Sequence, residues 1–248
     1  MKATRIQLCG RMALELEGRR LEDALPGRQG KLVFGYLALN RMRPVDRSEL
    51  VAVLWPDERP VAAETTLSGV LSRLRHVLGD DVLTGRAQPR LVLPHDAWLD
   101  VEAAVAAIHQ AESAVANDDW QGAWLSGRIA LHVGRREFLS GFDASWIDEQ
   151  QRELAKIHRS ALECIGEAGL GIGGTEIAAA ERSGRALIAC EPYRESGYRL
   201  LMRALEGQGN NAAALTVYDE LRRRLRDELG TAPGAMTQAL HKQLLGAG

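Results

Sequence analysis

The 248-residue sequence lacks the features that mark several common classes of protein. No run approaches the roughly 20 consecutive apolar residues that a membrane-spanning helix requires, and the amino terminus shows no apolar signal-peptide segment. The three cysteines, Cys9, Cys164 and Cys190, are an odd number without Cys-x-x-Cys spacing, which argues against a disulfide framework and a zinc site. We therefore expect a cytoplasmic protein without membrane association, metal or cofactor, whose cysteines are buried thiols.

The sequence also lacks an excess of charge of either sign. Its 31 Lys and Arg residues against 33 Asp and Glu residues give a net charge of -2. Residues 1–98 hold 15 basic and 12 acidic residues, a net of +3, and the remainder holds 16 and 21, a net of -5. Domains that bind nucleic acid are usually more basic than this. DNA binding must therefore be argued from where the positive residues lie.

Motifs for catalysis are absent as well. The sequence contains no phosphate-binding loop and no His-Glu-x-x-His pair, and its six histidines are scattered. The glycine-rich stretch at 169–174 has no preceding strand, which a dinucleotide-binding motif requires. We therefore predict a protein without enzymatic activity, and we interpret this stretch as a flexible connection between two helices.

The first hundred residues mix the periods of strands and helices. The expected elements are strands at 5–8, 13–17, 81–84 and 90–93 and helices at 29–40, 47–54 and 62–78. Asp46 and Glu49 have the spacing of a capping box and predict the start of the second helix. Because a sheet, three helices and a hairpin follow one another in this order, residues 1–98 are predicted to form a winged helix.

After about Leu99 only helical periodicity remains. The expected helices span 101–116, 120–133, 145–169, 173–190, 193–207, 211–228 and 234–245. Small residues recur seven positions apart in the second helix of a pair, as at Ala123 and Ala130, which lets paired helices approach closely. We therefore predict a mainly α protein with small β-sheets, in which an N-terminal winged helix-turn-helix at 1–98 precedes a C-terminal all-α, tetratricopeptide-like helical array at 99–248.

The helix expected at 62–78 has two different faces. Leucine and valine residues form an apolar stripe at helical spacing, and the opposite face is small and basic. Such a face can enter the major groove, where arginine binds guanine edges. A solvated amphipathic helix is the alternative that this pattern leaves open. The candidate DNA-binding residues on this face are Thr65, Thr66, Ser68, Gly69, Ser72, Arg73, Arg75 and His76.

The hairpin expected at 81–93 adds two candidates. Arg86 and Arg90 lie at and beside its turn. From there, arginines can follow the DNA backbone or enter the minor groove. The hairpin therefore favours the interpretation of the preceding helix as a DNA-binding helix.

Several stretches resemble known families. Residues 67–79, LSGVLSRLRHVLG, resemble the recognition helix of the OmpR/PhoB-type winged helix, and residues 45–56 resemble the helix before it. Resemblance to the bacterial transcriptional activator domain is carried by residues 191–195, 201–205, 214–218 and 225–233. A winged helix followed by that domain is the arrangement of the Streptomyces antibiotic regulatory protein (SARP) family. The resemblance spans nearly the whole chain.

This resemblance implies a transcriptional activator that binds short direct repeats in double-stranded DNA near promoters and recruits RNA polymerase. On the family pattern, the positions that face DNA are Thr66, Gly69, Arg73 and Arg75. Arg47 and the hairpin arginines would lie on phosphate or in a groove. Relatives bind repeated sites side by side, which implies a homodimer on DNA.

Two further hypotheses concern partners. Five arginines near one helix junction could bind a small anionic ligand, such as a signalling nucleotide, through bidentate phosphate contacts. They are Arg182, Arg185, Arg194, Arg199 and Arg203. The alternative for these arginines is a solvated face balanced by neighbouring glutamates. The whole chain could instead be a protein-interaction scaffold that uses the winged helix and the helical array as adaptor surfaces.

Overall fold

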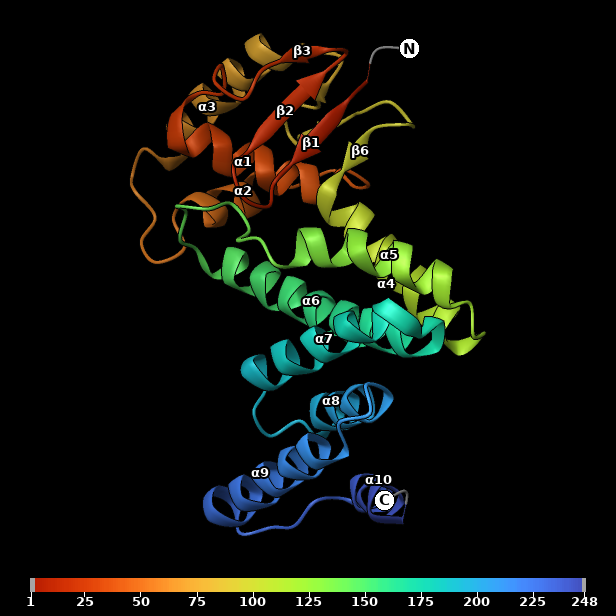
Figure 1. Ribbon diagram of the computed structural model, residues 1–248. Helices are drawn as coiled ribbons and strands as arrows, with labels where there is room; N and C mark the ends of the chain where they lie inside the picture. The colour runs from red at the N-terminus through yellow and green to blue at the C-terminus, as the bar shows by residue number, and fades with distance from the viewer. Residues whose placement is uncertain (1–2, 247–248) are drawn as a thin grey trace. The chain divides into compact units, whose positions relative to one another are not determined.

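The computed structural model describes residues 3–246, which form two compact units. The first unit comprises the residues up to Ala103 together with Val133–Leu154, and the second comprises Ala104–His132 and the residues from Ala155 onward. The predicted architecture, mainly α with small β-sheets, is confirmed (Figure 1). Within residues 3–246, no helix combines the length and the apolar character needed to cross a bilayer.

A four-stranded sheet opens the first unit (Figure 1). Its strands are β1 (Arg5–Gln7), β2 (Ala13–Leu16), β3 (Arg19–Arg20) and β6 (Trp98–Leu99), in the order β3-β2-β1-β6. β1 pairs antiparallel with β2 and parallel with β6, so that Ile6 lies opposite both Leu14 and Leu99. The sequence predicted β1 and β2 but missed β3 and β6, because neither of the two lies within a longer strand-like run of residues.

Three helices and a hairpin complete the winged helix. They are α1 (Gly27–Leu39), α2 (Arg47–Leu54), α3 (Ala63–Leu78), β4 (Leu83–Thr84) and β5 (Arg90–Leu91). The apolar stripe of α3 is buried as predicted, with Leu67, Leu71 and Leu74 fully inaccessible. Each such burial stabilises the fold by roughly 1.5–3 kcal/mol, which is enough to fix the orientation of the helix.

The capping box predicted at the start of α2 is only partly correct: the prediction that the Asp46 side chain caps the helix is wrong. The helix does begin directly after Asp46, but the Asp46 side chain makes no capping hydrogen bond. Its carboxylate instead accepts a hydrogen bond of 2.8 Å from Nε2 of Gln88. The Glu49 carboxylate accepts hydrogen bonds from Arg43 and Tyr36, which hold the pKa of Glu49 below its usual value. Both carboxylates therefore join α2 to other parts of the unit.

The connection after α5 (Trp120–Gly134) contributes to the core of the first unit. The N–H of Gly10 donates to the Glu137 carbonyl at 2.7 Å, and the N–H of Leu139 donates to the Leu8 carbonyl at 2.9 Å. Phe138 and Leu139 are almost completely buried. The compact unit around the winged helix therefore extends past the predicted boundary at residue 98.

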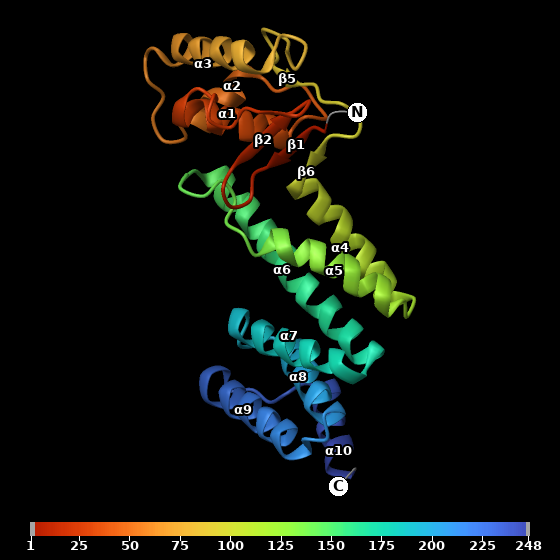
Figure 2. The ribbon, with the colours of Figure 1, turned by 45° about the horizontal axis from the view of Figure 1, so that its top comes forward.

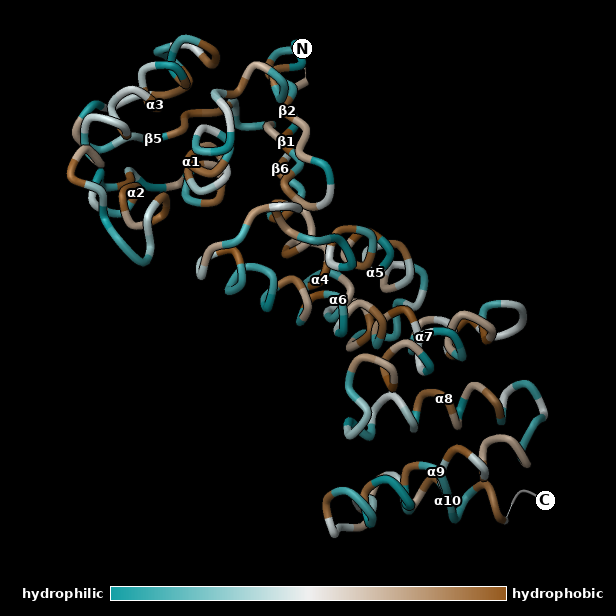
Figure 3. The backbone as a smooth tube through the Cα atoms, turned by 90° about the vertical axis from the view of Figure 1, so that its left-hand side faces the viewer, coloured by the Kyte–Doolittle hydropathy of each residue, from teal (hydrophilic) through white to brown (hydrophobic). Residues whose placement is uncertain are grey.

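The second unit is an array of paired helices. It contains most of α4 (Asp100–Ala116), α5 and α6 (Ser145–Ile172), followed by α7 (Ile177–Cys190), α8 (Glu195–Gly207), α9 (Asn211–Leu229) and α10 (Ala235–Gly246). Hydrophobic and hydrophilic residues alternate along these helices (Figure 3). A Cβ at Gly184 would lie 2.9 Å from Leu201, so α7 and α8 touch where a small residue permits it. The predicted tetratricopeptide-like array is confirmed.

The glycine-rich stretch at 169–174 is not the connection that the sequence predicted. Gly169 and Gly171 lie in α6, and the chain turns only at Gly173 and Gly174, where φ is +76° and +57°. A Cβ at Gly171 would lie 2.3 Å from the ring of Trp120, so glycine lets α6 approach α5 closely. The prediction failed because glycine in a sequence marks a close contact as readily as a break.

Two of the three cysteines are buried as predicted, whereas Cys190 is exposed. Burial raises the pKa of Cys164 to about 12, and it also raises the pKa of Cys9. Because the thiolate is the reactive species, we expect iodoacetamide to alkylate only Cys190 in the folded chain and all three cysteines after denaturation in urea. Mass spectrometry counts the adducts. Alkylation of a folded Cys190→Ser variant would contradict the burial of the other two thiols.

Candidate nucleic-acid interface

The face of α3 opposite its buried stripe carries most of the residues predicted to contact DNA. Thr65, Ser68, Gly69, Ser72, Arg73 and His76 are exposed, and Thr66 and Arg75 are partly buried. A Cβ at Gly69 would meet no atom within 4 Å, so this position leaves open space on the face. Figure 2 shows α3 at the edge of the first unit, with the β4–β5 hairpin beside its C-terminal end.

Two arginines of this region have no hydrogen-bond or ion-pair partner in the part of the chain that the structure describes. Arg73 on α3 and Arg86 at the hairpin turn are exposed and make no hydrogen bond or ion pair with any residue in the range 3–246. A free guanidinium can bind a guanine edge with two hydrogen bonds, or it can bind a phosphate. The two side chains are therefore available to a polyanion.

Arg47 and Arg90 are held by the protein itself. Nη2 of Arg47 donates to Oγ of Ser68 at 2.8 Å and lies 3.2 Å from the Glu64 carboxylate, which ties α2 to the first turns of α3. Nε of Arg90 donates to the Arg41 carbonyl at 3.3 Å. Arg47 and Ser68, which the sequence predicted as separate DNA contacts, thus bind each other.

Arg75 reaches from α3 to the hairpin. Its Nε donates to the Leu83 carbonyl at 3.3 Å, and its Nη2 donates to the Gly85 carbonyl at 2.6 Å. Gly85 has a φ of +70°, and a Cβ there would lie 2.2 Å from the Gln88 carbonyl oxygen, so the turn requires glycine. This contact could not be predicted from the sequence, because no local pattern shows where a hairpin will lie beside a helix.

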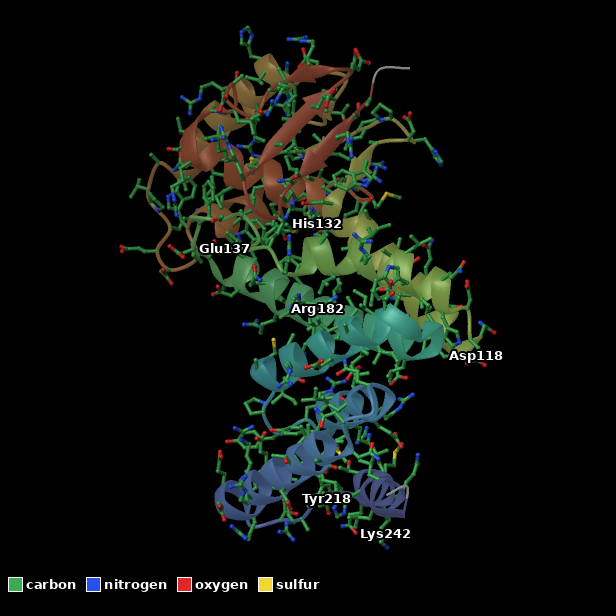
Figure 4. All side chains as sticks on the ribbon, viewed as in Figure 1. Asp118, His132, Glu137, Arg182, Tyr218 and Lys242 are labelled. Carbon is green, nitrogen blue, oxygen red and sulfur yellow. The ribbon has the colours of Figure 1, made fainter. Side chains whose placement is uncertain are left out.

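The five arginines predicted to bind an anionic ligand do not form one cluster of free cations. Arg182 on α7 (labelled in Figure 4) is exposed and makes no hydrogen bond or ion pair with any residue in the range 3–246, although its charge helps to lower the pKa of Glu181. The other four have partners at 2.8 to 3.1 Å: Arg185 with Glu181, Arg203 with Glu167, Arg194 with Glu163 and Glu191, and Arg199 with the Thr237 hydroxyl. This arrangement matches the alternative of a solvated face balanced by glutamates.

Comparison with known proteins agrees with the fold. The family model described as the bacterial transcriptional activator domain matches residues 99–245. AfsR of Streptomyces coelicolor is 32% identical over 246 residues, which cover 99% of this chain and 24% of AfsR. The transcriptional regulatory protein MoaR1 of Mycobacterium tuberculosis is 26% identical over 266 residues, which cover 98% of this chain and 79% of MoaR1.

A solved structure extends the agreement to the whole chain. The structure of Mycobacterium tuberculosis EmbR in complex with a low affinity phosphopeptide matches with a TM-score of 0.82 and 25% identity. The match covers 100% of this chain and 66% of that one. A winged helix followed by such a helical array defines a class of bacterial regulatory proteins.

The chain belongs to the bacterial transcriptional activator domain family, and it has the winged helix and helical array of the SARP-type regulators. The resemblance inferred from the sequence motifs is thereby confirmed. This chain spans about a quarter of the length of AfsR, at 24% for the Streptomyces coelicolor protein and 22% for that of Streptomyces griseus.

Proposed function

We propose that this chain is a cytoplasmic, sequence-specific DNA-binding transcriptional activator that inserts α3 into the major groove and has no catalytic role. The observation that carries the proposal is the face of α3, where the free guanidinium of Arg73 lies among small residues opposite a fully buried stripe. Small side chains permit close approach to the base edges, and a free arginine can bind guanine. The family membership and the regulatory names of the relatives support the same conclusion.

The partners follow from the same proposal. We propose that the chain binds direct repeats near promoters as two copies side by side and recruits RNA polymerase. The match to the bacterial transcriptional activator domain supports a role in activation. Control by a nucleotide is a further part of the proposal. An open hollow of about 480 Å³, lined in part by Arg194 and Arg199, lies where α8 and α10 begin and is the place to look for such a ligand.

Selection of duplexes from a random pool, followed by fluorescence anisotropy of the full chain, tests DNA recognition. The selected duplex should bind at least about 10³-fold more tightly than an unrelated duplex. Its affinity should fall as salt rises from about 50 to about 200 mM, with a logarithmic slope of about 0.9 per phosphate contact. If the folded chain binds no duplex at about 50 mM salt, the protein-interaction scaffold becomes the better interpretation.

A further inference from the structure

The wing, defined here as residues 83–91, is fastened to several neighbouring elements of the first unit. Just before its second strand, the Pro89 carbonyl accepts a hydrogen bond of 2.9 Å from the N–H of Val45, and Arg90 on that strand binds the carbonyl of Arg41. The Gln88 side chain binds the carboxylate of Asp46, just before α2, at 2.8 Å. The part of the wing after Arg86 is therefore held by the segment between α1 and α2.

The part of the wing before Arg86 is held from a different direction. The guanidinium of Arg75 joins the carbonyl oxygens of Leu83 and Gly85 to α3, and Gly85 is the residue immediately before Arg86. Arg86 itself has no partner among residues 3–246. Arg75 thus fastens the chain next to the one free cation of the wing.

We propose that Arg75 is a positioning residue that fixes the wing in its DNA-bound conformation and so presents Arg86 to a phosphate. This role replaces the direct DNA contact predicted from the sequence, and it rests on the proposed function. A loop that is already ordered loses little conformational freedom on binding, so its contacts contribute more to affinity. A guanidinium suits the role because its planar fork can bind two acceptors at once, which an ammonium point charge does worse.

A double-mutant cycle on the full chain tests this role. Arg86→Ala should remove one phosphate contact, so the ratio of affinities at about 50 and about 200 mM salt should shrink by about 3.5-fold. Arg75→Ala should produce a similar change although Arg86 is intact. The double variant should bind no more weakly than Arg75→Ala alone, because Arg86 contributes only when the wing is fixed.

Two comparisons separate positioning from direct contact. Arg75→Lys keeps the charge but loses the fork, and it should behave like Arg75→Ala. The matched control is the pair of variants Arg73→Ala and Arg86→Ala. Their effects should add, because neither side chain makes a hydrogen bond or ion pair with any residue in the range 3–246. In the absence of DNA, Arg75→Ala should speed hydrogen exchange of the wing amides, whereas Arg86→Ala should leave it unchanged.

Three results would overturn the positioning role of Arg75. Additive losses for Arg75 and Arg86, full binding by Arg75→Lys, or unchanged hydrogen exchange in Arg75→Ala would each overturn the positioning role. Failure of the proposed function looks different, because the wild-type chain would then bind no selected duplex. In that case hydrogen exchange alone still shows whether Arg75 fixes the wing.

Discussion

Arg73→Ala is expected to reduce the discrimination between the selected duplex and an unrelated one. A bidentate contact between arginine and guanine contributes about 1–3 kcal/mol of discrimination, so affinity for the selected duplex should fall by about 5- to 150-fold. Affinity for unrelated duplexes should change much less, because phosphate contacts carry most of it. Anisotropy titrations with both duplexes measure the two effects.

The Arg73→Ala substitution should change DNA binding without changing the stability of the fold. Arg73 is exposed and makes no hydrogen bond or ion pair within the described residues 3–246, so the free energy of unfolding should change by no more than about 0.5 kcal/mol. Arg128→Ala is the matched control, since Arg128 is also exposed and unpartnered among residues 3–246 but lies on α5 in the second unit. The Arg128→Ala variant should bind the selected duplex and the unrelated duplex with the same affinities as the wild-type chain. Undiminished discrimination in a folded Arg73→Ala variant would show that α3 is not the DNA-binding helix.

Asp100→Ala is expected to destabilise the first unit more than any surface substitution. The Asp100 side chain is buried, with 1% of its surface exposed. Its carboxylate accepts hydrogen bonds of 2.8 to 3.0 Å from the backbone N–H groups of Leu8, Cys9 and Val101. Without an acceptor, each of these buried groups costs about 1–3 kcal/mol. The three groups would together cost about 3–9 kcal/mol, and removal of the carboxyl's own burial cost offsets part of this. The substitution should therefore lower the free energy of unfolding by about 2–5 kcal/mol.

The contribution of Asp100 to the free energy of unfolding depends on whether its carboxyl is protonated. Burial raises the pKa of the Asp100 carboxyl, although the hydrogen bonds from Cys9 and Leu8 act in the opposite direction. Ionising the carboxyl therefore costs more in the folded chain than in the unfolded one. Its contribution to stability is largest at low pH and declines as the pH rises through the raised pKa. The loss in Asp100→Ala should accordingly be smaller at neutral pH than at acid pH.

Urea denaturation of the full chain measures the effect of Asp100. Asp96→Ala is the matched control, because Asp96 lies in the preceding turn, is exposed and has no partner among the described residues. It should change the free energy of unfolding by no more than about 0.5 kcal/mol. An equally small change for Asp100→Ala would mean that the N–H groups of Leu8 and Cys9 find other acceptors. The expected loss would also weaken DNA binding, because Asp100 fastens the end of β1.

The helices and the family could be predicted from the sequence because both depend on local patterns. Apolar residues at the 3.6-residue period placed α3 within one residue of its observed ends. The buried stripe of α3 and its exposed face follow from the same period. The ordered motifs from 45–56 through 225–233 were enough to identify the SARP arrangement.

Only the tertiary structure decided which of the predicted arginines are free. Arg73 and Arg75 lie two positions apart on one helix, yet Arg75 binds the wing and Arg73 binds nothing in the described chain. Arg47 likewise binds Ser68, 21 residues away, and Asp100 binds Leu8, 92 residues away. Such hydrogen bonds depend on the path that the chain takes between distant residues. Local periodicity does not encode that path, so the sequence determined the faces of the helices and the fold determined which side chains remain for a ligand.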